Sequence, residues 1–246
     1  MSQTQTLSAR PLALAPNPGE AAAADEYART GLIQLHDFLE PASADTSLNI
    51  LRNETRWRTI YNDGALTHEV DEEEFNRDPN ARMRITRDVF SRAKYDFQYI
   101  FDQFPVFVMN EEGKPLSAAH QSILDFFNGE IFLDAMRRIT RDDRITFADV
   151  FLSRYRPGHF LTSHDDKMDG TERLHAYVFN LTHNWKMDWG GMLLFIDDNT
   201  GNVPIGLRPT FNTLNLFKVP RSHTVSLVAP FAPEARYAVT GWLRAS

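Results

Sequence analysis

The chain has 246 residues, a formal net charge of −7, 42% hydrophobic and 24% charged residues, and no cysteine. This balance indicates one large or two small globular domains, and without a basic block it argues against nucleic acid as a partner. The missing thiols exclude disulfides, cysteine-ligated zinc, iron–sulfur clusters and thiol nucleophiles. No apolar run reaches the ~20 residues of a membrane span and no secretory leader is recognisable, so a cytoplasmic protein without membrane contact is expected.

The first 143 residues are expected to be mainly helical. Residues 1–18 are polar, contain proline and show no periodicity, which predicts a flexible tail. Residues 19–246 are predicted to form a single domain, in which residues 19–143 supply helical support. Helices are expected within residues 17–31, 41–55 and 82–103 and as a pair within 115–143, with a strand over 32–39 and a solvated acidic run over 69–75.

The texture of the sequence changes after Arg144. Short β-rich runs such as "ITFADVFLSRY", "LHAYVFNLT" and "RYAVTGWL" follow one another and are separated by turn-forming residues. Helices followed by seven or eight short strands are typical of an antiparallel sandwich or jelly roll with helical support. The predicted fold class is therefore α+β, with a double-stranded β-helix (jelly-roll, cupin-like) core over residues 144–246.

Two histidines and one acid in this second half have the composition of a metal site. His164 and Asp166 lie two residues apart at the end of a predicted strand, and His223 opens another short strand further along. Because alternate residues of a strand share a face, His164 and Asp166 are expected to point the same way, with Asp165 as the alternative ligand. Two imidazoles and one carboxylate on one face of a metal form the facial triad of non-haem Fe(II) oxygenases.

Arg236 lies within the apolar run "EARYAVTGW". A guanidinium on a core strand is unfavourable unless it meets an anion, and its planar fork suits a carboxylate. The order His164-x-Asp166, His223, Arg236 resembles the 2-oxoglutarate- and Fe(II)-dependent dioxygenases, specifically their prolyl-hydroxylase-like branch. The resemblance covers residues 144–243 and, more loosely, the helical half. It extends to "YRPGHFLTSHDD", to the Gly-Gly-x-Leu strand in "WGGMLLFID" and to the final strand "RYAVTGW".

The resemblance implies which residues form the active site. The implied catalytic residues are the three Fe(II) ligands His164, Asp166 and His223. Arg236 would bind the distal carboxylate of 2-oxoglutarate, with Arg244 as its alternative. The other implied contacts with this co-substrate are Tyr155, Thr240, Trp242 and Asn180, of which Asn180 stands where the family often has a tyrosine.

The resemblance also implies an activity. It is hydroxylation of an unactivated C–H bond, coupled to decarboxylation of 2-oxoglutarate to succinate, with ascorbate as a candidate reductant. The expected substrate is a prolyl residue of a peptide or protein, or a small amino-acid-like molecule. A carboxylate at Asp166 disfavours halogenation, since related halogenases have a small residue there. The alternatives are a non-catalytic cupin-like protein that binds a metal or small molecule, and an oxygenase of nucleic-acid repair type.

The remaining histidines and two arginines are weaker candidates. His159 faces either substrate or solvent in the predicted turn before the metal site, and Arg154 and Arg156 are candidates for binding an acidic group of the substrate. The other histidines are expected to be structural or exposed: His36, His68, His120, His175 and His183.

Overall fold

The computed structural model describes residues 11–16 and 20–245 of the chain. Leu12 is buried and Leu14 forms an isolated antiparallel bridge with Leu39. The prediction of a flexible tail is therefore wrong for residues 11–16, because they are fixed to the fold by apolar burial and backbone pairing. The rest of the predicted tail lies outside the described residues.

Helices occupy mainly the first half of the chain. Three begin with a capping side chain, since Asp71, Asp78 and Ser117 each accept a hydrogen bond from a backbone amide of the helix they precede. The helices are α1 (Glu20–Thr30), α2 (Pro41–Asn49), which continues as a π-helical turn (Ile50–Glu54), α3 (Glu72–Arg77), α4 (Pro79–Arg92), α5 (Val106–Glu111), α6 (Ala118–Phe127), α7 (Glu130–Thr140) and a 3-10 turn (Met187–Trp189).

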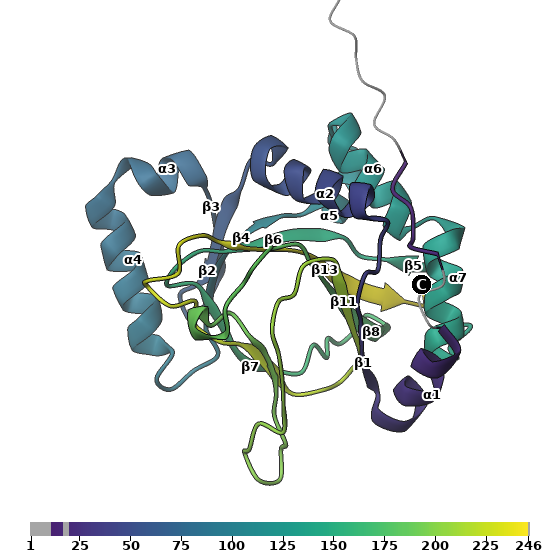
Figure 1. Cartoon of the computed structure of the whole chain (residues 1–246). Helices are drawn as coiled ribbons and strands as arrows, with labels where there is room; N and C mark the ends of the chain where they lie inside the picture. Colours follow the sequence, from purple (N-terminus) through teal and green to yellow (C-terminus); the bar gives the residue numbers. More distant parts are fainter. Residues whose placement is uncertain (1–10, 17–19, 246) are drawn as a thin grey trace, which may run out of the picture.

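The strands form one curled antiparallel sheet, shown in Figure 1. Its order is β1-β11-β8-β13-β6-β4-β7-β12-β9-β10, with β2 between β3 and β4, and with β5 beside β13. This confirms the predicted jelly-roll class. The strands are β1 (Leu32–Leu35), β2 (Arg58–Asn62), β3 (Thr67–Asp71), β4 (Tyr99–Phe104), β5 (Phe147–Ala148), β6 (Phe151–Tyr155), β7 (Phe160–His164), β8 (Arg173–Asn180), β9 (Leu193–Phe195), β10 (Ile205–Leu207), β11 (Thr213–Lys218), β12 (His223–Val225) and β13 (Arg236–Arg244).

The half that was expected to be helical also contributes strands to this sheet. The helix expected over residues 82–103 ends at Arg92, and its aromatic last part forms β4, which pairs with β6 and β7. Aromatic residues favour a half-buried strand, and here this preference prevails over the apparent helical spacing. The acidic run at residues 69–75 divides between β3 and α3, and its Phe75 is buried.

Helices and cavity lie on opposite faces of the sheet. Along β8, Tyr177 and Phe179 belong to the core beneath the helices, and the ring of Tyr177 stacks on Phe127 of α6 at 5.2 Å. Their neighbours Ala176 and Val178 point to the interior of the curled sheet. Because alternate side chains of a strand point to opposite faces, one face of β8 packs in the core and the other faces the site. Figure 1 shows α2, α5, α6 and α7 along this covered face, whereas α3 and α4 form a separate arm.

A buried polar contact ties α1 to β8. His175 lies between Tyr27, whose hydroxyl is 2.6 Å from its Nδ1, and Asp142, whose carboxylate is 3.2 Å from its Nε2. A neutral imidazole protonated at Nε2 satisfies both partners, because Nε2–H donates to the carboxylate and Nδ1 accepts from the hydroxyl. Burial lowers the pKa of His175 to about 4, so the folded chain keeps this imidazole neutral well below the usual pKa of histidine.

We expect this histidine to make the fold sensitive to acid. As the pH falls from ~6.5 to about 4, His175 becomes protonated in the unfolded chain but stays neutral in the folded chain. The free energy of unfolding therefore falls by up to ~3 kcal/mol. Urea unfolding at pH 7, 6, 5 and 4.5 should show a shallower pH dependence for His175→Gln than for the wild type. The exposed His183 provides the control, since His183→Gln should keep the wild-type dependence. Equal slopes for wild type and His175→Gln would contradict this role.

Candidate active site

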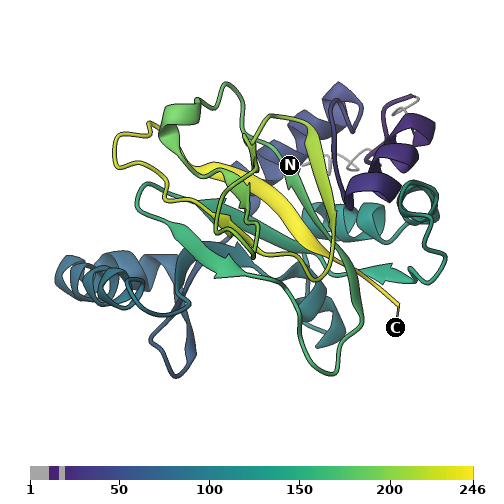
Figure 2. The same ribbon diagram turned by 90° about the horizontal axis from the view of Figure 1, so that it is seen from below.

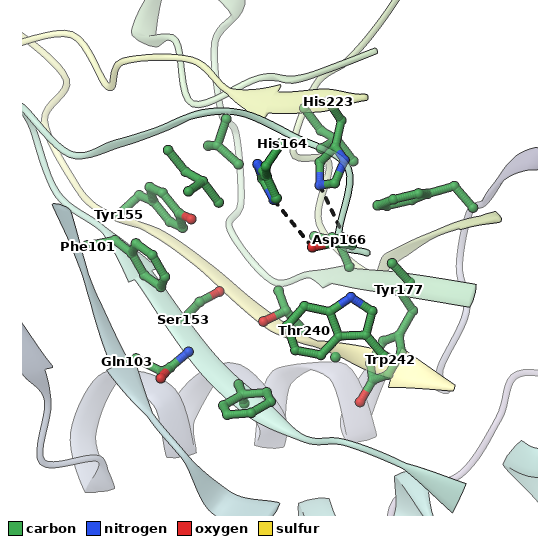
Figure 3. Close-up of a pocket in the computed structure, with 18 of the residues that line it drawn as sticks. Phe101, Gln103, Ser153, Tyr155, His164, Asp166, Tyr177, His223, Thr240 and Trp242 are labelled. Carbon is green, nitrogen blue, oxygen red and sulfur yellow. Dashed lines mark ion pairs between the residues drawn. The ribbon is translucent and has the colours of Figure 1, made fainter. Parts of the chain in front are cut away.

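A cavity of about 110 Å³ opens inside the curled sheet. Strands β4, β6, β8 and β13 form one wall, and β7, β9 and β12 form the other. Figure 3 shows the side chains that converge on it. Ionisable groups that could hold a metal or an anion gather at two places in a mostly apolar lining. One is a cluster of two histidines and an aspartate, and the other is the guanidinium of an arginine at the start of β13.

His164, Asp166 and His223 form the first polar group. β12 pairs with β7 so that His223 lies directly opposite His164. Nε2 of His164 is 3.4 Å from one carboxylate oxygen of Asp166, and Nε2 of His223 is 3.5 Å from the other. One ligand atom from each residue lies within 4.8 Å of the other two. The structure therefore brings together the three residues that the sequence selected.

Both imidazoles are oriented by the backbone. Nδ1 of His164 is 2.9 Å from the carbonyl oxygen of Thr162, and Nδ1 of His223 is 2.8 Å from that of Arg221. Each Nδ1–H can donate to its carbonyl, which leaves the Nε2 lone pairs directed at the centre of the cluster. Burial, with a further contribution from the nearby His164, lowers the pKa of His223 to about 4. This imidazole is therefore neutral at physiological pH, as a metal ligand must be.

Asp166 reaches the cluster by a route that strand alternation does not describe. β7 ends at His164, and Asp166 has a φ of +64°, in the left-handed region. Arg173 donates to its backbone carbonyl at 3.2 Å. Burial alone would raise the pKa of Asp166, but hydrogen bonding to His164 and the nearby imidazoles bring it below its ordinary value. The alternative residue Asp165 accepts a hydrogen bond from the amide of Lys167 and is not in the cluster.

Arg236 supplies the second polar group. Its side chain is 2% exposed, and among the described residues its Nε and Nη1 have no hydrogen-bond partner. Nη2 donates to Oδ1 of Asn180 at 3.2 Å, and the guanidinium lies 5.4 Å from the ring centre of Tyr155. Burial lowers the pKa of Arg236 to about 10, so it stays cationic at neutral pH. A buried cation with free donors in a cavity is suited to bind a carboxylate.

The other co-substrate contacts implied by the resemblance divide into two groups. Tyr155, Thr240 and Trp242 line the cavity, and Figure 3 shows Trp242 close to Asp166. Residues 236, 240 and 242 share the inner face of β13 because they are an even number of positions apart. Asn180 does not line the cavity. It holds Arg236 from behind and is itself fixed by a bond to the carbonyl oxygen of Thr213 at 3.3 Å.

Two of the weaker predictions are wrong. Arg154 and Arg156 do not project freely toward a substrate, because both form ion pairs at 2.8 Å with the fully buried Asp102, and both approach Glu72. His159 is buried and does not line the cavity, so it faces neither solvent nor the substrate side, and burial lowers its pKa to about 4. The ion pairs of Arg154 and Arg156 connect the end of β6 to β4 and α3, and the two arginines flank Tyr155 in the sequence.

The structure adds cavity residues that sequence reasoning missed. Phe101 stacks on Tyr155 with ring centres 4.8 Å apart, and Gln103 follows it on the same face of β4. The alternation in "YIFDQF" was the signal for this strand, but the aromatic density concealed it. Arg173 was also missed, and its guanidinium lies 3.6 Å from the ring centre of Trp242.

The cluster has the composition that non-haem Fe(II) requires. Two imidazoles and a carboxylate on one side leave the cavity side open, which is the facial arrangement of iron oxygenases. The buried and unpartnered donors of Arg236 fit a second anionic group in the same cavity. The residues present therefore fit both Fe(II) and 2-oxoglutarate.

Comparison with solved structures shows the same fold in several proteins. A prolyl-4-hydroxylase from Pseudomonas putida matches with a TM-score of 0.55 and 17% identity over 92% of this chain and 98% of that protein. A prolyl hydroxylase from Trichoplax adhaerens, solved with a peptide fragment of hypoxia inducible factor, gives 0.57 and 18% over 93% and 90%. A 2OG-Fe(II) oxygenase family oxidoreductase from Burkholderia pseudomallei gives 0.59 and 12% over 94% and 93%.

Residues 150–244 match the family model of the 2OG-Fe(II) oxygenase superfamily. This segment belongs to that superfamily. The match supports a 2-oxoglutarate-dependent dioxygenase with Fe(II) as its metal, and the structural neighbours that share the fold include prolyl hydroxylases. The prediction of an enzyme of this kind is confirmed, and the alternative of a non-catalytic binding protein is set aside. A search of curated sequences finds no relative of the oxygenase. None of its described helices combines the length and apolar character needed to cross a membrane.

Proposed function

We propose that the oxygenase hydroxylates a prolyl residue of a peptide or protein. In this reaction a C–H bond of the substrate becomes C–OH with one atom of O₂, and 2-oxoglutarate takes up the other atom as it becomes succinate and carbon dioxide. One observation carries the proposal: the histidine–aspartate cluster opens into the same cavity as the guanidinium of Arg236, whose Nε and Nη1 have no hydrogen-bond partner among the described residues. A metal and a dicarboxylate can therefore be held side by side.

We propose that His164, Asp166 and His223 hold Fe(II), which when bound supplies the activation of O₂ that organic side chains cannot provide. The carbonyl groups of Thr162 and Arg221 keep both imidazoles in the required tautomer. These contacts set the positions of the ligands before the metal arrives, which reduces the reorganisation that binding would otherwise require.

We further propose that Arg236 orients 2-oxoglutarate through its distal carboxylate. Asn180 holds one guanidinium nitrogen, so the remaining donors are fixed in direction. Thr240 and Tyr155 flank this end of the cavity, and burial raises the pKa of Tyr155, which keeps its hydroxyl protonated. A neutral phenol beside the guanidinium can donate to the co-substrate without competing for the cation.

The substrate class is inferred from the lining of the open side. Leu161, Val225 and Phe101 provide apolar surface next to the metal cluster, which suits a pyrrolidine ring. The Trichoplax adhaerens protein was solved with a peptide fragment, which supports a peptide over a free amino-acid-like molecule. We also propose that residues 19–246 act as one catalytic domain, because β1 and β4 of the first half pair directly with strands of the second half.

The proposed reaction predicts coupled products. With Fe(II), 2-oxoglutarate, ascorbate and oxygen, proline-containing peptides should gain one oxygen atom, and succinate should form in equal amount. Slow succinate formation without peptide is expected for the wild type. Asp166→Asn, which keeps the shape but removes the charge, should lose both products by more than ~100-fold. Succinate and peptide mass are measured in the same samples. Succinate formed at full rate by Asp166→Asn, or a wild type that never oxidises a prolyl peptide in a broad peptide screen, would contradict the proposal.

A further inference from the structure

The helix α4 carries an unusual concentration of positive charge. Between Pro79 and Lys94 the sequence "PNARMRITRDVFSRAK" contains five basic residues and one acidic residue, in a chain whose net charge is −7. Ile85, Val89 and Ala93 pack inward against Phe160 of β7. The helix is therefore fixed to the sheet on one side, and its other side remains open. Figure 2 shows α3 and α4 projecting from the body of the fold.

The open side of α4 combines basic and apolar residues. Arg82, Met83, Arg87, Phe90 and Lys94 line one hollow along the helix, and Met83 is 64% exposed. Within the part of the chain that the structure describes, Arg82 and Lys94 make no ion pair. Arg87 pairs only with the adjacent Asp88, at 3.3 Å between two exposed side chains. These charges are therefore free to meet an external partner.

A second hollow continues from this face toward the active site. It lies between α4 and strands β7 and β12, and Phe90 borders both hollows. Leu161 and Val225 border the second hollow and also line the cavity of the metal cluster. Leu227, on the rim of this hollow, is 45% exposed. Leu161 and Val225 thus lie between the apolar hollow beside α4 and the cavity of the metal cluster.

We propose that the open face of α4 and the adjoining hollow form a docking surface for an acidic segment of the polypeptide substrate. The proposal rests on the proposed function, because the docked chain is the one whose prolyl residue enters the cavity. From Arg82 to its end at Arg92 the helix extends about 15 Å, which matches four or five residues of extended peptide, and Lys94 follows just beyond this end. Carboxylates of that segment would meet the three basic residues, and its apolar side chains would lie between Phe90 and Leu227.

A peptide fits this surface better than the other polyanions do. Glu73 and Glu74 of α3 lie just before α4 in the sequence, and Asp78 precedes its first turn and lies 3.9 Å from Arg84, so acids accompany the basic residues at the start of the helix. A nucleic acid backbone or an anionic membrane would meet those acids as well. The inward face of α4 is already occupied by the sheet, so Met83 and Phe90 are the exposed large apolar side chains that the described helix could offer to lipid.

The test measures peptide binding without turnover. Fluorescein-labelled 15-residue peptides with one central proline are titrated by anisotropy, under anaerobic conditions with Fe(II) and 2-oxoglutarate. Two peptides carry three acidic residues and a leucine, before or after the proline, and two counterparts carry lysine in place of the acids. We expect one acidic peptide to bind at least ~10-fold tighter than its lysine counterpart, with an advantage that shrinks as salt is added.

Charge-reversal variants identify the surface. Arg82→Glu/Arg87→Glu/Lys94→Glu should weaken the acidic peptide by ~10-fold or more, whereas Arg29→Glu/Arg56→Glu/Arg208→Glu, with three exposed arginines elsewhere, should change it less than ~2-fold. Leu227→Ser should also weaken binding, unlike Val203→Ser at a site of similar exposure. Circular dichroism and thermal melting confirm that each variant is folded.

Equal losses in the two triple variants, or no preference for acidic peptides, would overturn the proposal. Binding of an oligodeoxythymidylate or of phosphatidylglycerol vesicles as tight as that of the acidic peptide would also overturn it. Succinate formation without peptide, measured separately, distinguishes a failure of the docking surface from a failure of the proposed chemistry. If it is present without charge-selective binding, the docking surface fails and the proposed chemistry stands. If acidic peptides bind α4 selectively but no succinate forms, the docking surface stands and the proposed chemistry fails.

Discussion

Replacing His223 with alanine is expected to weaken Fe(II) binding by more than ~100-fold. Loss of an outer hydrogen-bond partner of a ligand already weakens metal binding by about 10- to 100-fold, and loss of the ligand itself should do more. His223 lies opposite His164, and each imidazole faces one carboxylate oxygen of Asp166. Without His223, only His164 and Asp166 of this cluster remain to hold the metal. Anaerobic equilibrium dialysis with Fe(II), followed by metal analysis, gives both stoichiometry and affinity.

A second buried histidine serves as the control for this result. His120 is packed between Thr55 and Ser117, outside the cluster. We expect His120→Ala to bind one Fe(II) per chain with an affinity close to that of the wild type. Circular dichroism excludes unfolding as the cause of any loss. If His223→Ala keeps the stoichiometry and affinity of the wild type, the assignment of the three ligands is wrong.

The second large effect is expected at Arg236. Truncation to alanine would leave the distal carboxylate of 2-oxoglutarate without a partner in a mostly apolar cavity, at a cost of about 2–5 kcal/mol, or about 30- to several-thousand-fold in affinity. Arg236→Lys should lose less, because the charge remains while the planar fork does not. Fe(II) binding should hardly change in either variant, since Arg236 is not in the metal cluster. Anaerobic calorimetric titration of 2-oxoglutarate into the Fe(II)-loaded chain gives these affinities.

Arg244 provides the matched control on the same strand. Its guanidinium pairs with Asp149 at 3.4 Å and lies over the ring of Phe147, outside the cavity. Arg244→Ala should therefore keep the wild-type affinity for 2-oxoglutarate. Wild-type affinity in Arg236→Ala together with a loss in Arg244→Ala would exchange the roles of the two arginines.

Much of the site was predictable because its residues depend on local patterns. The alternation of "RYAVTGW" places Arg236, Thr240 and Trp242 on one face of β13 in any sheet that contains this strand. The spatial proximity of His164 and His223 could not be predicted from such a local pattern. It depends on the register between β7 and β12, two strands far apart in the sequence.

The parts that sequence reasoning missed depend on long-range contacts. Asp102 gave no sign that it would be fully buried, and its burial is compensated by Arg154 and Arg156, in and just after β6, and by the hydroxyl of Thr59 in β2. Because the ion pairs with Asp102 could not be foreseen, Arg154 and Arg156 were interpreted as candidates for binding a substrate. Similarly, Asp166 joins the cluster through a left-handed backbone that no strand pattern predicts, although the sequence motif had pointed to this residue.

The most direct test of a shared site for Fe(II) and 2-oxoglutarate is an anaerobic optical titration. Chelation of Fe(II) by 2-oxoglutarate produces a visible charge-transfer band, which neither component gives alone. We predict that the wild type develops this band to saturation with one Fe(II) per chain, that Arg236→Ala needs about 30-fold or more additional 2-oxoglutarate, and that His223→Ala gives no band. A wild-type chain that binds Fe(II) and 2-oxoglutarate separately but never develops the band would contradict the shared site.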